Sequence, residues 1–135
     1  MITLRNSKIP ITNADAVVKV FRDLLALDDK IDQDKEHVYI MHLDTRSRVN
    51  LVELVGIGIL DKALVHPRET FRRAIIEGSS SIILGHNHPS GEADPSEEDI
   101  FITKKLVDAG DILDIKLLDH IIFTNDAYYS FQKGR

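Results

Sequence analysis

The sequence of 135 residues contains no cysteine. Disulfide bonds are therefore excluded, and so are zinc sites built on thiolate ligands. Any transition metal that this protein binds must be held by imidazole nitrogens and carboxylate oxygens.

Long apolar runs and an excess of positive charge are also lacking. No stretch approaches the roughly 20 apolar residues that cross a membrane, and residues 1–15 lack the apolar core of a signal peptide. We therefore expect a cytoplasmic protein with no membrane partner. The net charge of -5 argues against a protein whose main role is to bind nucleic acid. A local basic patch around Arg68, Arg72 and Arg73 is the alternative, but a solvated helix face is the favoured interpretation.

The pattern of apolar residues and breakers predicts one domain over residues 1–135, since strands and helices alternate along the whole chain. That alternation is typical of an α/β protein with three layers, in which helices cover both faces of a mixed sheet. The helices are expected over 13–25, 67–78 and 96–109, with a stop at Gly110, and the strands over 37–44, 49–59, 80–88 and 112–124 (one strand or a pair), with an edge strand in 127–135.

The segment GHNHPSGEADPSEED places two histidines where an apolar strand ends. Residues two apart in a strand point to the same face, so His86 and His88 aim together. Asp99 follows in the first turn of the next predicted helix, which Asp94 or Ser96 caps. Two imidazoles and one carboxylate make the three protein ligands of a catalytic zinc. Alternatively, the histidines are solvated and the acid only favours the helix N-terminus.

A catalytic zinc also needs a base that moves the proton of its water. Glu53 is the candidate, because it interrupts the apolar strand NLVELVGIG and an unpaired buried carboxylate is costly. A solvent-facing position on an edge strand explains Glu53 equally well. His120 either orients a ligand from behind or is a hydrogen-bonded core residue, and the second interpretation is favoured. His66, before Pro67, is expected to begin a helix.

The spacing His-x-His, seven residues, Ser, two residues and Asp resembles the signature of the JAMM (MPN-plus) metalloproteases. The wider stretch from VHPRETFRRAII to LLDHIIF is similar to the RadC branch of these JAB-domain proteins. The resemblance implies a cytidine-deaminase-like fold with a zinc ion on His86, His88 and Asp99. It further implies that Glu53 acts through the zinc-bound water and that Ser96 stabilises the tetrahedral intermediate.

The reaction that the resemblance implies is hydrolysis of a peptide or isopeptide bond in a protein substrate. RadC proteins carry an N-terminal helix-hairpin-helix region that binds DNA. We expect this region to be absent, because only one candidate helix precedes the first core strand. Deamination is set aside for want of cysteine ligands. The leading hypothesis is a zinc-dependent hydrolase, and the alternative is a DNA-repair-associated accessory protein with a structural or vestigial metal.

Overall fold

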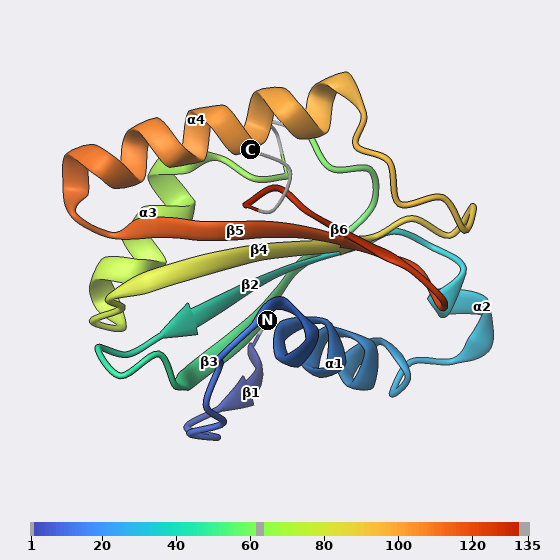
Figure 1. The fold of residues 1–135 in the computed structure, drawn as a ribbon, viewed down its shortest axis with the longest axis horizontal. Coiled ribbons are helices and arrows are strands. Elements are labelled where there is room, and N and C mark those ends of the chain that lie inside the picture. The colour runs from blue at the N-terminus through green and yellow to red at the C-terminus, as the bar shows by residue number, and fades with distance from the viewer. Residues whose placement is uncertain (1, 62–63, 133–135) are drawn as a thin grey trace.

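Six strands form one mixed sheet in the order β1-β3-β2-β4-β5-β6 (Figure 1). The computed structural model describes residues 2–61 and 64–132. Among these described strands, only β4 and β5 run parallel; the other neighbouring pairs are antiparallel. The strands are β1 (Ile2–Arg5), β2 (His37–Leu43), β3 (Val49–Ile57), β4 (Ser81–Asn87), β5 (Lys116–Phe123) and β6 (Tyr128–Ser130), and the helices are α1 (Ala14–Leu25), α2 (Lys30–Gln33), α3 (Pro67–Ile76) and α4 (Glu97–Leu113).

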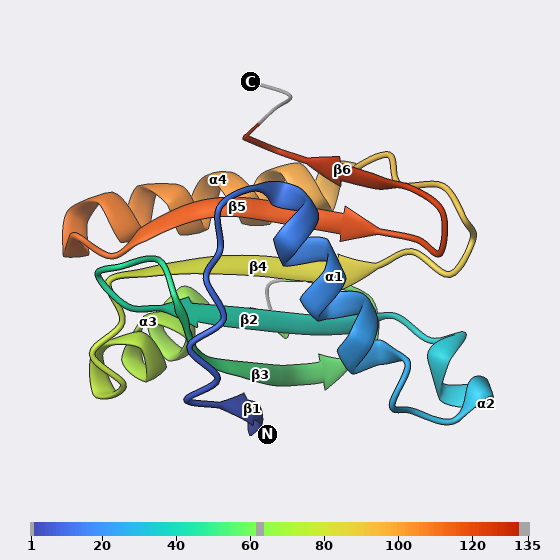
Figure 2. The ribbon, with the colours of Figure 1, turned by 60° about the horizontal axis from the view of Figure 1, so that its bottom comes forward.

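Helices cover both faces of the sheet, as the sequence predicts for a three-layer α/β domain. Figure 2 shows α1 crossing one face, with α3 and α4 behind the other. The α1 side of the core includes Phe21, Tyr39 and Ile83. The α3 and α4 side includes Leu84 and Ile102. None of the described helices is long and apolar enough to cross a membrane.

The alternation of β4 decides where the two histidines of the motif point. Ile83 lies on the α1 side and Leu84 on the α3 and α4 side. Because side chains alternate along a strand, His86 shares the face of Leu84 and points toward α4. Gly85 faces α1, where a Cβ atom would lie 2.3 Å from the ring of Phe21. The missing side chain at Gly85 lets α1 pack directly behind the histidines.

Several predicted boundaries are wrong, and the clearest error is the end of α4. Gly110 was expected to stop this helix, but α4 continues to Leu113 and ends at Asp114, whose φ of 58° is left-handed. Gly110 lies inside the helix because the backbone of Ile115 passes close to it; a Cβ atom at Gly110 would lie 2.4 Å from the Ile115 carbonyl oxygen. A glycine required by close packing looks, in sequence, like a glycine that ends a helix.

Other differences are smaller. The expected strand over 112–124 is the single strand β5 and begins later, at Lys116, because α4 takes up its first residues. The expected strand over 49–59 ends at Ile57. Neither β1 nor α2 was expected; each has only four residues, too few for a recognisable pattern. The tail forms β6 as predicted, while residues 133–135 lie outside the described residues.

Candidate metal centre

The structure brings the three predicted ligands together at the end of β4. His86 is fully buried, and Asp99 is 3% exposed. His88 follows β4 directly, and its N–H donates to the carbonyl of Phe123 over 3.0 Å, which extends the pairing with β5. Asp99 reaches the same point from the first turn of α4. The C-terminal end of β4 and the N-terminus of α4 therefore supply all three side chains.

The donor atoms of these side chains have the spacing of zinc ligands. His86 Nε2 and His88 Nε2 lie 3.0 Å apart. The two carboxylate oxygens of Asp99 lie 3.3 Å from His86 Nε2 and 3.4 Å from His88 Nε2. Tetrahedral zinc with bonds of about 2.0–2.1 Å separates its ligand atoms by about 3.3 Å. The observed distances fit one small cation bound by all three residues.

A capping box holds Asp99 in position. The side-chain oxygen of Ser96 accepts from the Asp99 N–H over 3.0 Å, and Asp99 Oδ2 accepts from the Ser96 N–H over 2.8 Å. Ser96, rather than Asp94, is thus the cap of α4. A hydroxyl has one proton, and Ser96 uses only its oxygen in this box, so that the proton remains available to a bound ligand.

Both histidines direct the same nitrogen toward the centre. His88 Nδ1 lies 2.9 Å from the carbonyl oxygen of Glu92, which can only accept, so Nδ1 carries the proton. His86 Nδ1 is also occupied, 2.9 Å from His120 Nε2. Two Nε2 atoms and a carboxylate thus converge in a buried place. Such a set of acceptors is electrostatically unfavourable unless a cation or a proton lies among them, which is the arrangement that a zinc site requires.

The electrostatics of the cluster agree with this arrangement. Burial favours a raised pKa for Asp99, but the close contacts with His86 and His88, which favour the carboxylate form when either ring is protonated, outweigh it and hold this pKa well below its ordinary value. The hydrogen bond with Asp99 raises the pKa of His88. Complete burial lowers the pKa of His120 well below its ordinary value, so His120 is neutral. Metal binding to such a site displaces protons from it.

A second carboxylate, which sequence reasoning missed, adjoins the centre. Glu36 Oε1 lies 4.0 Å from His88 Nε2, and Glu36, His86 and His88 each offer an atom within 4.8 Å of the other two. Glu36 directly precedes β2, in which Val38 pairs with His86. It ends the charged run DDKIDQDKE, where one acid among many is not distinctive. Glu36 is farther from His88 than Asp99 is, which suits a base beside the metal better than a ligand.

Glu53 does not lie where the sequence analysis expected it. The Glu53 carboxylate lies 3.2 Å from His42 Nε2 and 3.5 Å from Arg73 Nε. In the sheet Glu53 pairs with Ile40, whereas Val38 is the β2 residue that pairs with His86. Glu53 is therefore two positions farther along the sheet, with β2 between it and the centre.

The burial of Glu53 has a structural explanation. Glu53 is 8% exposed, and β3 lies between β1 and β2, so the alternative of a solvent-facing edge strand is also wrong. Its carboxylate forms an ion pair with Arg73 and a hydrogen bond with His42. A buried, paired carboxylate needs no catalytic role, and the expectation that Glu53 serves the metal-bound water loses its geometric basis.

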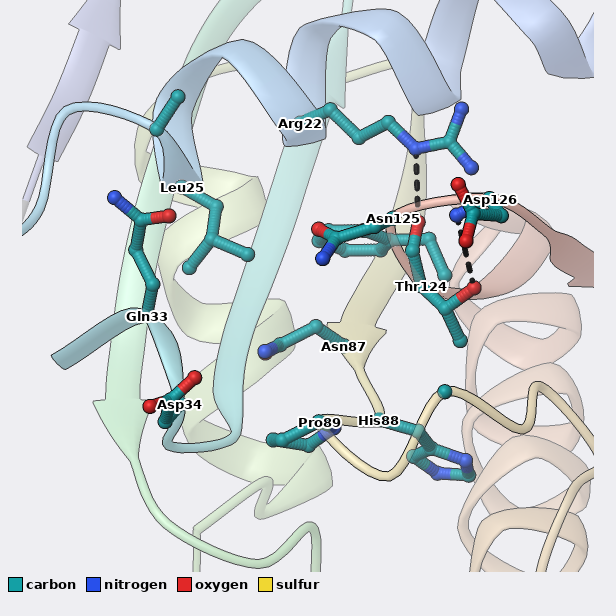
Figure 3. Close-up of a pocket in the computed structure, with 13 residues that line it drawn as sticks. Arg22, Leu25, Gln33, Asp34, Asn87, His88, Pro89, Thr124, Asn125 and Asp126 are labelled. Atoms are coloured by element: carbon teal, nitrogen blue, oxygen red, sulfur yellow. Dashed lines mark hydrogen bonds between the residues drawn. The ribbon is translucent and has the colours of Figure 1, made fainter. Parts of the chain in front are cut away.

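Two hollows lie next to His88. One, of about 220 Å³, is shown in Figure 3; Asn87 and His88 lie beside it, Asp34 borders it on one side and Asp126 on another. The other is lined by Asp34, Glu36, His88, Pro89 and Ser90. The hollows share Asp34, His88 and Pro89. The hollow that includes Glu36 adjoins the metal centre, at the point where the side chain of His88 is 16% exposed.

Comparison with known proteins identifies the family of this chain. The family model described as RadC-like JAB domain matches residues 11–135. A "UPF0758 protein" of Chlorobium chlorochromatii is 46% identical over 102 residues, which are 76% of this chain and 46% of that protein. A protein of the same name from Methanosarcina acetivorans is 46% identical over 101 residues, 75% of this chain and 44% of its own. The matched region thus spans about half the length of these relatives.

Proposed function

Because the chain belongs to the RadC-like JAB domain family, we propose that it is a zinc-dependent hydrolase that cleaves amide bonds in a peptide or protein substrate. The convergence of His86 Nε2, His88 Nε2 and the Asp99 carboxylate within 3.4 Å carries this proposal. Three protein ligands leave a fourth position open, as catalytic zinc requires.

The bound zinc would supply Lewis-acid activation of a carbonyl and a water molecule with a lowered pKa. Glu36 takes the place that the sequence analysis gave to Glu53. Its Oε1 accepts a proton from the attacking water and passes it to the leaving amine, as a general base and then a general acid. The half-buried position of Glu36 at the rim of the hollow leaves it accessible to both groups.

Ser96 supports the same reaction from the other side of Asp99. The Asp99 N–H donates to the side-chain oxygen of Ser96 and fixes its position. The hydroxyl proton of Ser96 therefore remains available to a bound ligand. The Ser96 hydroxyl donates a hydrogen bond to the oxyanion that forms when the substrate carbonyl carbon becomes tetrahedral. The substrate lies along the hollow lined by Glu36, His88 and Pro89.

The test combines metal analysis with a screen of peptide and isopeptide substrates. Protein purified without chelator should contain about one zinc per chain, and His86→Ala/His88→Ala should contain none. Glu36→Gln should keep zinc and lose turnover by at least about 100-fold, the range of general acid–base catalysis. Glu53→Gln is the matched control, because it removes the same charge from a buried position away from the centre.

Two outcomes would contradict parts of this proposal. If no substrate in the screen is cleaved and the purified protein holds no metal, the hydrolase proposal fails. If cleavage occurs, unchanged turnover in Glu36→Gln together with loss in Glu53→Gln would restore Glu53 as the base.

A further inference from the structure

His120 lies directly behind the metal centre and contacts one of its ligands. His120 is fully buried in β5, and its Nε2 lies 2.9 Å from His86 Nδ1. On its other side, His120 Nδ1 lies 2.5 Å from Thr103 Oγ1 of α4. Thr103 Oγ1 in turn donates to the carbonyl oxygen of Asp99 over 2.7 Å. These contacts form one hydrogen-bonded relay from the backbone of Asp99 to the ring of His86.

The protons of this relay have only one arrangement that satisfies every contact. Thr103 has a single hydroxyl proton, and the Asp99 carbonyl can only accept, so this proton goes to Asp99. Thr103 Oγ1 must then accept from His120 Nδ1–H. With both rings in their neutral forms, the proton on His120 Nδ1 leaves His120 Nε2 as an acceptor, and the 2.9 Å contact with His86 is made by His86 Nδ1–H. The Nε2 of His86 is left with a free lone pair, directed at the centre.

The opposite arrangement places a proton where the metal must bind. If Thr103 donated to His120 Nδ1, then His120 Nε2–H would donate to His86 Nδ1, and the proton of neutral His86 would lie on Nε2. In addition, the 2.7 Å contact between the oxygens of Thr103 and Asp99 would have no proton. The carbonyl of Asp99 therefore decides, three contacts away, which nitrogen of His86 is free.

The ring of His120 is also fixed in orientation. It stacks on Phe131 with a centroid distance of 4.7 Å and an interplanar angle of 2°. The N–H of Phe131 donates to the carbonyl of His120 over 3.1 Å. A ring held in this way cannot turn to exchange its two nitrogens without displacing Phe131.

We propose that His120 and Thr103 are positioning residues that set the tautomer of His86, so that His86 presents an unprotonated Nε2 to the metal. This inference rests on the proposed metal centre, but its first consequence concerns the metal-free protein. The sequence analysis favoured a hydrogen-bonded core residue at His120. That interpretation accounts for the burial of His120 but not for its contact with His86.

The experiment measures the tautomer of His86 by long-range ¹H–¹⁵N correlation in metal-free protein, at a pH where the ring is neutral. Wild type should show the Nδ1–H form. Thr103→Val, which keeps the shape and removes the hydroxyl, should shift His86 toward the Nε2–H form and weaken zinc binding by about 10- to 100-fold, measured against a competing chelator. Thr103→Ser should restore both properties.

Thr70→Val is the control, because Thr70 is another buried helical threonine, 5% exposed against 4% for Thr103, on α3. It should change neither the tautomer nor the affinity. An Nε2–H tautomer in wild type would overturn the inference whether or not the variants fold. A folded Thr103→Val protein with wild-type tautomer and affinity would do the same. If wild type binds no zinc but His86 has the Nδ1–H form that Thr103→Val disturbs, the relay stands and the hydrolase proposal fails.

Discussion

The histidines of this protein have different structural roles, and the hydrogen-bond partners of each ring determine its role. The sequence contains six histidines. His37 Nε2 lies 2.6 Å from Asp28, and His42 joins Ser79 to Glu53. His66 caps α3 as expected, since its ring accepts from the Arg68 N–H. His86 and His88, by contrast, direct nitrogens at one another across 3.0 Å.

A carboxylate outside the metal centre should make stability depend on pH. The hydrogen bond from Arg5 holds the pKa of Glu77 below its ordinary value, with a smaller contribution from Arg73. A lowered folded-state pKa stabilises the protein above the ordinary carboxyl pKa, and this stabilisation is lost as pH falls through the folded-state value. Glu77→Gln should therefore lower the Tm slightly at pH 7, and the difference from wild type should vanish in acid. Calorimetry at pH 7 and pH 3 checks this; an equal difference at both pH values contradicts it.

Residues with short-range spacing could be predicted from the sequence, and those that depend on strand register could not. His86, His88 and Asp99 lie in one segment, so strand alternation and a helix start bring them together. The choice between Glu36 and Glu53 depends on which β2 residue pairs with His86, and no local pattern reveals that pairing. Glu53 attracted attention as an acid among apolar residues, but its partners His42 and Arg73 belong to other elements, β2 and α3.

At the scale of elements, the N-terminus of α4 and the end of β4 act as one unit. The capping box of Ser96 and Asp99 ends the loop and fixes a ligand in the same two hydrogen bonds. The other end of α4 is equally constrained, because Gly110 accepts from the N–H groups of Asp114 and Ile115. The α4 helix is therefore fixed at both ends, while its middle packs on the sheet through residues such as Ile102 and Leu106.

The close approach at Gly110 predicts an unusual effect of alanine. Alanine is favoured over glycine in a helix by about 1 kcal/mol. At Gly110, however, a Cβ atom would lie 2.4 Å from the backbone oxygen of Ile115, which cannot move aside as a side chain can. We expect Gly110→Ala to destabilise the protein by about 1–3 kcal/mol in urea denaturation. Asp111→Ala, at the next and exposed position, should change stability by less than about 0.5 kcal/mol. Stabilisation by Gly110→Ala would show that the backbone relaxes freely.

At the scale of the whole molecule, the metal centre and the main group of paired charges lie at different places on the sheet. The central strands β2 and β4 are buried along their full lengths, with helices on both sides. The centre lies at one end of these strands, where β4 gives way to a loop and α4 begins (Figure 1). The paired charges of Glu53, Arg73 and Glu77 lie on β3 and at the C-terminal end of α3, away from the metal centre, and contribute to stability.

A metal that binds only the folded protein should raise its thermal stability. At a free zinc concentration of 100 times Kd, the gain is about 2.7 kcal/mol, or about 10 °C in Tm for a domain of this size. Thermal unfolding with zinc and with chelator measures the difference. His88→Ala should remove it, since only two of the three ligands remain. An equal rise in His88→Ala would place the stabilising ion elsewhere.

The stacking of Phe131 on His120 connects the residue that follows β6 to the candidate metal centre. Because coupling between two sites is reciprocal, we expect a metal ion bound by His86 to stabilise β6, and local unfolding of β6 to weaken metal binding. Amide hydrogen exchange in β6 should therefore slow when the metal binds.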